Sequence, residues 1–309
     1  MIVSVAPSPA LDRTLVVHAL TPGDIHRPAA AVSVAGGKGL NVARAAHTLG
    51  ADVVACAVLG GAIGDVVLRL LAADGIEVSL VAGERETRTC TSVADASTGD
   101  MTEFYELATE VAAQEWADLE HRVAHELDRR PGWLTISGSM PPGAPIEAVA
   151  RLTKLAHERG SRVAVDTHGA ALGAALDERP DIVKVNIDEA AHVLGRDLAD
   201  ARTAAQALHD RRQHGWLTVV TASTDGAWAI NDTARWHVGT ASRGSFAQGS
   251  GDSFLAGLVH GLDADPDDVA SALSLAAGAA SANAQQPGAA VLDPDLARAL
   301  ARAAIITRS

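Results

Sequence analysis

Residues 133–166 read "WLTISGSMPPGAPIEAVARLTKLAHERGSRVAVD", in which two short apolar runs flank a longer stretch of helical pattern. The runs at 133–137 and 162–166 are typical of buried strands. The stretch at 145–160 has apolar side chains at helical spacing and ends on Gly160. Strands that alternate with helices of this length indicate a parallel sheet covered by helices on both faces. The stretch therefore predicts an α/β fold.

The same alternation extends over most of the chain. Further strands are expected at 52–60, 181–186 and 217–222, and further helices at 41–50, 65–75, 188–195 and 201–215. No low-complexity linker, charge block or repeat divides the sequence, so we expect one domain over residues 1–309. Residues 12–35 and 85–107 lack the helical period and contain β-type runs. We expect them to form a small antiparallel sheet that projects from the body as a lid.

Composition excludes several classes of protein. The chain has 309 residues, is 48% hydrophobic but only 3% aromatic, and has a formal net charge of −13. The core must therefore be aliphatic, and the acidic balance argues against binding to nucleic acid or to anionic membranes. The two cysteines, Cys56 and Cys90, have no motif partner and indicate free thiols in a reducing compartment. With no signal-peptide pattern and no membrane-length apolar run, we expect a cytoplasmic protein.

Polar residues follow several of the expected strands where each strand ends. In parallel sheets ligands bind at the carboxyl ends of the strands, so a site is expected along this rim. Each position taken alone is also compatible with a helix cap or a turn. The rim residues are Ser137, Ser139, Asp166, Lys184, Asn186, Thr221 and Ser223.

A glycine-rich turn, "AQGSGDSFLAGL" at 247–258, runs directly into an apolar helical stripe. The amides of Gly249, Ser250 and Gly251 then lie at the positive end of a helix, where they can bind an anion. Asp252 beside them can take a proton from an attacking hydroxyl, and the helix terminus keeps its carboxylate ionised at neutral pH. The structural alternative is that Asp252 only complements the helix dipole.

A second glycine-rich loop, "AGGKGLNVARAAHTLG" at 35–50, also leads into a helix. Its spacing is not that of a Walker A motif, and no Ser or Thr follows Lys38. The sequence contains only three lysines (Lys38, Lys154 and Lys184), and Lys38 in this loop favours an anionic or polyhydroxyl ligand. Asn41 offers both a donor and an acceptor to a sugar hydroxyl, although it could instead be an N-cap.

These two stretches resemble the two signature regions of the ribokinase-like, PfkB-type carbohydrate kinases. "SPALDRTL" at 8–15, "ETR" at 86–88 and "SGSMPPG" at 137–143 resemble the branch of that family that phosphorylates sugar phosphates. "KVNIDE" at 184–189 matches the family's Asn-x-x-Glu. The motifs keep the family's order over essentially the whole chain, so the resemblance implies a ribokinase-like fold with a β lid, which often forms a dimer contact in relatives.

The resemblance also implies roles for individual residues. Asp252 would be the general base, with the anion hole formed by Gly249, Ser250 and Gly251. The sugar would be held by Asp12, Gly37, Lys38 and Asn41, and Ser139 would touch it. Arg88, Lys38 and Arg27 would hold a phosphate already on the substrate. Asn186 and Glu189 would organise Mg²⁺ through water. Lys184, Thr221, Ser223 and Gly226 would line the phosphates of ATP, and Asn283 would lie near the adenine.

Four departures from the family pattern fall on the nucleotide side and on the lid. Val185 replaces a proline, and Ser223 in "TASTDG" stands where a glycine is usual. "FAQ" at 246–248 replaces a "TVG"-like run, and "ELATEV" at 106–111 lacks the usual Gly-Pro. The proposed base and anion hole are intact.

The expected activity is ATP-dependent phosphorylation of a ketose phosphate, such as fructose 1-phosphate or tagatose 6-phosphate, to the bisphosphate. This is an activity of the 1-phosphofructokinase type, and the expected protein is a homodimer joined through the lid. Two alternatives remain open. One is a kinase of an unphosphorylated sugar or nucleoside, and the other is a sensor of sugar phosphates or nucleotides without turnover.

Overall fold

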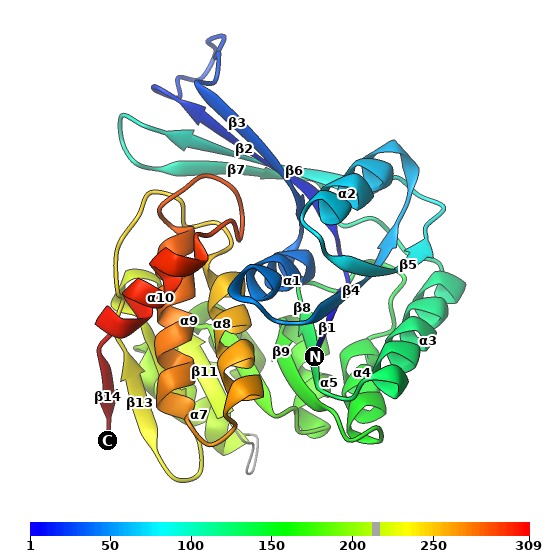
Figure 1. Ribbon diagram of the computed structural model, residues 1–309, viewed down its shortest axis with the longest axis vertical. Coiled ribbons are helices and arrows are strands. Elements are labelled where there is room, and N and C mark those ends of the chain that lie inside the picture. The colour runs from blue at the N-terminus through cyan, green and yellow to red at the C-terminus, as the bar shows by residue number, and fades with distance from the viewer. Residues whose placement is uncertain (212–216) are drawn as a thin grey trace.

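The computed structural model describes residues 1–211 and 217–309 and confirms the α/β architecture (Figure 1). A large sheet has the strand order β14-β13-β12-β11-β10-β9-β8-β1-β4-β5. The six pairs from β11 to β5 are parallel, and the three pairs from β11 to β14 are antiparallel. In chain order its strands are β1 (Ile2–Ala6), β4 (Val53–Leu59), β5 (Glu77–Ala82), β8 (Trp133–Ser137), β9 (Arg162–Asp166), β10 (Ile182–Asn186), β11 (Leu217–Thr221), β12 (Ala227–Ile230), β13 (Arg235–Val238) and β14 (Ile306–Arg308).

Helices cover both faces of this sheet and enclose two hydrophobic cores. One face carries α1 (Lys38–Leu49), α2 (Gly61–Ala73), α8 (Ser250–Ala264), α9 (Val269–Asn283) and α10 (Pro294–Ala303). The other carries α3 (Ala113–Arg129), α4 (Ala148–His157), α5 (Gly169–Asp177), α6 (Ile187–Leu194) and α7 (Ala201–Arg211). The expected helix at 201–215 is α7 as far as Arg211; its last expected residues lie outside the described residues. No helix in the described ranges combines the length and the apolar character needed to cross a bilayer.

The side chains of strand β4 pack alternately into the two cores. Val53, Ala55 and Ala57 pack into the core under α1 and α8, whereas Val54 and Cys56 pack into the core under α3 and α4. Successive side chains of a strand point to opposite faces, so a strand buried on both sides must be apolar throughout. Cys56 and Cys90 are both buried free thiols.

Two glycines let α8 lie directly against α9. A Cβ on Gly257 would lie 2.9 Å from the Cα of Ala276, and one on Gly261 would lie 2.7 Å from the Cα of Ala272. No larger residue fits at either position unless one helix moves. The close approach of the two backbones therefore fixes the position of α8, the helix whose first turn carries Asp252.

The small sheet projects from the body, as the lid pattern predicted (Figure 1). Its order is β3-β2-β6-β7, with β2 (Ala10–Val17), β3 (Ala30–Gly36), β6 (Arg88–Asp95) and β7 (Met101–Tyr105). The outer pairs are antiparallel as expected, but the central pair β2–β6 is parallel. The reason is that β2 follows β1 and β6 follows β5, two strands that run in the same direction in the large sheet.

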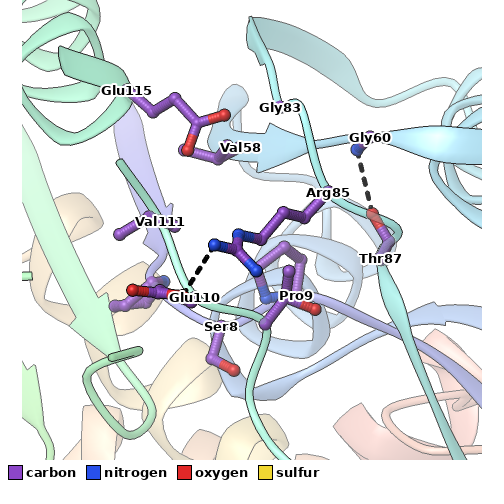
Figure 2. A pocket seen from close by; sticks show the side chains of 12 residues that line it. Ser8, Pro9, Val58, Gly60, Gly83, Arg85, Thr87, Glu110, Val111 and Glu115 are labelled. Carbon is purple, nitrogen blue, oxygen red and sulfur yellow. Dashed lines mark hydrogen bonds and ion pairs between the residues drawn. The ribbon is translucent and has the colours of Figure 1, made fainter. Parts of the chain in front are cut away.

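Polar contacts hold the lid to the body at its root, the place where the lid strands leave the large sheet. Figure 2 shows the ion pair between Arg85 and Glu110, 2.8 Å long, and the hydrogen bond from the Gly60 amide to Thr87 Oγ1, 3.0 Å. Thr109 Oγ1 also donates to the Glu86 carbonyl at 2.9 Å. The cavity among these residues measures about 20 Å³, which is room for about one water molecule. It is part of the lid's attachment and is too small to hold a substrate.

The lid leaves apolar side chains in solvent. Phe104 is 60% exposed, Tyr105 53%, and Leu107, just beyond β7, 92%. Ile25, in the connection between β2 and β3, is 83% exposed. A sheet with an open face and free edges is stabilised when a second sheet covers it. The lid is therefore the surface on which we expect a second copy of the chain to pack.

We predict that replacing Phe104 and Leu107 by glutamate converts a dimer into a monomer in light scattering. Each lost apolar contact removes roughly 1.5–3 kcal/mol, or about one to two decades in the dissociation constant. The matched control is Ile146→Glu, because Ile146 is 64% exposed but lies outside the lid, in the segment before α4. A wild type that is monomeric at assay concentration contradicts the expectation.

Candidate active site

Asp252 lies in the first turn of α8 and is only 6% exposed. The turn before it depends on Gly249, which has φ 79° and would place a Cβ 2.3 Å from the Ala290 amide nitrogen. Glycine adopts this left-handed conformation without strain, and no side chain fits there. The Asp252 carboxylate accepts a hydrogen bond from Asn41 Nδ2 at 2.9 Å. The structure therefore brings the two glycine-rich stretches together, as predicted.

The amides of the 249–251 turn are not equivalent. The Ser250 amide donates to the Ala247 carbonyl at 3.1 Å, so it is used within the turn. The first helical bond runs from the Ser253 amide to the Gly249 carbonyl at 2.8 Å. Amides in the first turn of a helix have no carbonyl partner within that helix, so those of Gly251 and Asp252 are directed outward. A Cβ on Gly251 would lie 2.9 Å from Lys184 Nζ, which places this ammonium against the turn.

Burial raises the pKa of Asp252 to about 6. The positive charge of Lys38 opposes this shift, the negative charge of Asp166 adds to it, and Lys184 and the Asn41 amide oppose it. The carboxylate is mostly ionised at pH 7, as expected. A helix N-terminus alone would lower the pKa of Asp252. Here the loss of solvation on burial has the larger effect and raises it.

Asp166, at the end of β9, is fully buried and pairs with two lysines. Its Oδ1 lies 2.8 Å from Lys38 Nζ, and its Oδ2 is bound by Lys184 Nζ. Burial opposes the charged form, but the two ammonium groups prevail and hold the pKa of Asp166 at about 2. The same carboxylate raises the pKa of Lys38. Both lysines of the candidate site are therefore held in place by one carboxylate.

Asn186 and Glu189 form a capping box at the start of α6. The Asn186 side chain accepts from the Glu189 amide at 2.8 Å, and Glu189 Oε2 accepts from the Asn186 amide at 2.9 Å. Glu189 Oε1 also lies 3.3 Å from Lys38 Nζ. Within residues 1–211 and 217–309, no three His, Cys, Asp or Glu side chains are grouped so that they could hold a metal ion.

The sugar-side residues lie where β2 and β3 leave the body. Asp12 is 4% exposed, and its carboxylate accepts from the Gly37 amide at 3.2 Å. A Cβ on Gly36 would lie 2.0 Å from Asp12 Cγ, so this glycine gives the carboxylate its space. Burial raises the pKa of Asp12. Ser139 is partly exposed in the turn after β8, where the neighbouring Gly138 amide donates to the Asp166 carbonyl at 2.8 Å.

Arg88 begins β6, next to β2 in the lid. Its guanidinium donates to the carbonyls of Glu106 and Ser8 at 3.0 and 3.3 Å rather than to the carboxylates of Glu86 or Glu103. Its buried Nε has no hydrogen-bond partner among the described residues. Glu106, in the segment that lacks the usual Gly-Pro, also accepts from the Thr89 amide at 2.7 Å. This departure therefore supplies a carboxylate tether to β6.

Two predicted phosphate ligands are not placed beside Arg88. The Lys38 ammonium is paired with Asp166 and Glu189. Arg27 is exposed in the connection between β2 and β3, at the outer end of the lid (Figure 1). Because Asp12 lies near the root of β2, this connection begins roughly 15 Å further along the strand. Arg27 therefore lies away from Asp12 within one chain, and its contact with a substrate phosphate stays a prediction.

A cavity of about 270 Å³ adjoins the anion-binding turn. Thr221, Ser223, Gly226, Ser250 and Gly251 line it, together with Phe254, Ala277 and Ala280. Four of these residues, Thr221, Ser223, Gly226 and Gly251, are among those expected to face the phosphates of ATP or the transferred group. Ser223 has φ 50°, a left-handed conformation that favours glycine, which is the residue usual at this position in the family pattern. Ser223 therefore holds a conformation that glycine adopts with less backbone strain.

Asn283 lies behind the anion-binding turn instead of lining the cavity. It is fully buried at the end of α9. Its Nδ2 donates to the Gln248 carbonyl at 2.8 Å and to Ser250 Oγ at 2.9 Å. Its amide is used to hold the turn, and its place near the adenine stays a prediction.

Sequence reasoning missed Arg44 and undervalued Asp166. Arg44 is 5% exposed, and its Nη1 lies 3.3 Å from Asn41 Oδ1. The available signal was an arginine three residues after Asn41 in a helix whose neighbouring residues are apolar. Asp166 was placed on the rim by its strand, but its two lysine partners come from distant segments.

Val185, in place of a proline, is buried in the sheet and pairs with Val220.

Comparison with known proteins agrees with this arrangement. Residues 4–296 match the model of the pfkB family of carbohydrate kinases. The chain is 34% identical over 287 residues to a 1-phosphofructokinase of Rhodobacter capsulatus, covering 89% of this chain and 90% of that protein.

Solved structures show the same fold. Phosphofructokinase-2 from Escherichia coli, in complex with substrates and products, is 27% identical with a TM-score of 0.88, covering 97% of this chain and 98% of that one. A Thermotoga maritima structure reaches a TM-score of 0.90 at 22% identity, covering 100% of this chain and 99% of that one, and this likeness shows the fold alone. The chain belongs to the pfkB family of carbohydrate kinases, and its fold is ribokinase-like.

Proposed function

We propose that this carbohydrate kinase transfers the γ-phosphoryl group of ATP to a hydroxyl of a ketohexose phosphate, most simply fructose 1-phosphate, to give the bisphosphate. The observation that carries the proposal is the buried Asp252 carboxylate, held by Asn41 beside a glycine-rich helix N-terminus and a cavity of about 270 Å³. The choice of substrate is supported by the likeness to the Rhodobacter capsulatus 1-phosphofructokinase over 89% of the chain.

Asp252 acts as the general base. It accepts the proton of the substrate hydroxyl while that oxygen bonds to the transferred phosphorus and the bond to the departing ADP breaks. A base is most effective when its pKa lies just below the working pH, and burial places the pKa of Asp252 at about 6. Asn41 donates to one carboxylate oxygen and leaves the other oxygen for the substrate.

The turn at 249–251 and Lys184 stabilise the charge on the transferred group. Outward-directed amides at a helix N-terminus match the equatorial oxygens of a phosphoryl group. The Lys184 ammonium lies against Gly251 and is fixed by Asp166, so it needs no rearrangement during the reaction. Thr221, Ser223 and Gly226 line the neighbouring cavity, into which the phosphates of ATP fit.

The substrate is held from the lid side. Asp12 binds sugar hydroxyls, with Gly37 and Ser139 close by, and Arg88 binds the phosphate already on the sugar. The unpartnered Nε of Arg88 supports this role, because a buried donor without an acceptor is costly unless a ligand supplies one. Within one chain Lys38 serves the nucleotide side instead, where it faces Glu189.

Magnesium neutralises charge on the phosphates of ATP when it is bound. Asn186 and Glu189 are the residues that would hold it, through water. Their oxygens are already used in the capping box, and Glu189 is also paired with Lys38, so the chain offers few free ligands of its own. The donor set fits an ion that arrives with the nucleotide.

We predict that Asp252→Asn lowers kcat by about 10²–10⁴ and leaves KM within a few-fold of wild type, because the amide fills the same space but cannot take a proton. Steady-state assays over a panel of phosphosugars measure this. Near-normal turnover by the variant rules out Asp252 as the general base. A wild type that binds sugar phosphates without turning any over favours the sensor.

We predict that Arg88→Ala raises KM for fructose 1-phosphate by about one to two decades, since a charge-assisted hydrogen bond contributes roughly 1.5–3 kcal/mol. Activity on free fructose or ribose should change little. The matched control is Arg85→Ala, because Arg85 also lies at the lid root but is paired with Glu110. If wild type prefers a free sugar, or the variant loses both substrates equally, the substrate is an unphosphorylated sugar or nucleoside.

We predict that the protein without nucleotide shows no stoichiometric magnesium binding at micromolar affinity in calorimetry. With a non-hydrolysable ATP analogue, binding should appear. Glu189→Gln should then raise the magnesium concentration needed for half-maximal activity, because the neutral amide orders metal-bound water less well. Tight magnesium binding to the protein alone contradicts the proposed ligand set.

A further inference from the structure

Arg44 is buried beneath the candidate active site. It lies on α1, one turn after Asn41, and is 5% exposed, whereas arginine is almost never buried without partners. Its partners come from four separate segments. Nη1 donates to Asn41 Oδ1 at 3.3 Å and to the Ala289 carbonyl at 3.1 Å, and Nη2 donates to the Ala35 carbonyl. Nε lies 3.0 Å from an oxygen of Asp74, whose side chain is 39% exposed.

The contact with Asn41 determines which way that amide points. A side-chain amide has an oxygen on one side and an NH₂ group on the other. Because Arg44 has only donors, the oxygen of Asn41 must face it, and the NH₂ group then faces Asp252 at 2.9 Å. A flipped amide would set an oxygen against the Asp252 carboxylate and an NH₂ group against a guanidinium. Both contacts would be repulsive.

We infer that Arg44 is a positioning residue for Asp252: through Asn41 it directs an N–H donor at the carboxylate and favours its ionised form. The inference rests on the proposed function, in which Asp252 is the base. The Asn41 hydrogen bond leaves only one Asp252 oxygen able to accept the substrate proton. Arg44 therefore influences both the charge of the base and the direction of its free oxygen, although it does not touch the substrate.

Several charged groups face this pair. Lys38 and Lys184 favour the ionised Asp252, and Asp166 opposes it. Arg44 faces Asp74 at the outer side and acts on the buried carboxylates of Asp12 and Asp252 through space. Removing Arg44 leaves the lysines and Asp166 in place. The expected change therefore comes from the lost positive charge and from the freed Asn41 amide, and both favour the protonated acid.

The test is the pH dependence of kcat/KM for wild type, Arg44→Met and the matched control Asp74→Asn. In Arg44→Met we expect the acid limb of the kcat/KM profile to move to higher pH by about one pH unit. The variant then loses about tenfold below pH 5.5, less than about twofold at pH 7 and almost nothing above pH 8.5. Asp74→Asn keeps the Arg44–Asn41 contact and should leave the acid limb in place. The second ionisation of the substrate phosphate is common to all three proteins, so only the difference between them is interpreted.

Arg44→Lys provides a second variant if Arg44→Met does not fold. It keeps the buried charge but loses the planar fork that reaches Asn41 and two carbonyls together, so a smaller upward shift is expected. In the wild type, the side-chain ¹⁵N resonance of Asn41 should titrate with the acid limb, because its N–H donates to Asp252. An unchanged acid limb or a uniform loss at every pH, in whichever variant folds, overturns the inference, as does an Asn41 resonance that does not titrate.

The outcomes also separate this inference from the proposed function. If Asp252→Asn keeps normal turnover, Asp252 is not the general base, and the proposed function is wrong on this point whatever the Arg44 variants do. If Asp252→Asn is inactive but Arg44→Met loses activity equally at every pH, the proposed function stands and Arg44 has only a structural role. Direct infrared titration of the carboxyl bands in the Arg44 variants, with Asp252→Asn as the blank, reads the ionisation of Asp252 without any assay of activity.

Discussion

A single buried carboxylate, Asp166, supports the charged side of the active site. It has no exposed surface, and each of its oxygens binds a different ammonium group, Lys38 from the start of α1 and Lys184 from β10. A buried charge is tolerated only when it is paired, and here two positive charges meet one negative charge. Glu189 supplies a second negative charge next to Lys38, and Lys184 lies against Gly251. The strand order places these groups together, because β9 lies between β8 and β10.

Asp252, the proposed base, belongs to a second buried arrangement in which desolvation outweighs the neighbouring positive charges. Asp252 is buried beside Asn41, and desolvation prevails over its cationic neighbours, so its pKa is raised while that of Asp166 is lowered. The pKa values of two aspartates in one site thus move in opposite directions, because Asp166 has two direct ion pairs and Asp252 has an amide as its hydrogen-bond donor. This difference suits a site in which one carboxylate must exchange a proton and the other must stay charged.

The sequence predicted what local pattern and motif order determine. The stretch at 133–166 indicated β8, α4 and β9, and the turn before residue 254 correctly placed Asp252 at a helix start. Features that depend on tertiary neighbours were not predictable in the same way. The ion pairs of Asp166, the burial of Asn283 and the parallel pairing of β2 with β6 all follow from which strands and helices become neighbours. Arg27 was assigned by motif, and the length of β2 separates it from the site within one chain.

The close contact between α8 and α9 has a consequence for how the protein moves. Gly257 and Gly261 leave no space between the two helices, so α8 cannot slide or rotate without collision. The helix that carries Asp252 therefore behaves as a fixed reference, together with the large sheet beneath it. Movement around a ligand is then expected in the projecting sheet, which contacts the loop before α8 through the hydrogen bond from Thr14 to Gln248. The tight packing of α8 therefore holds Asp252 in one place relative to the large sheet, whichever way the projecting sheet moves.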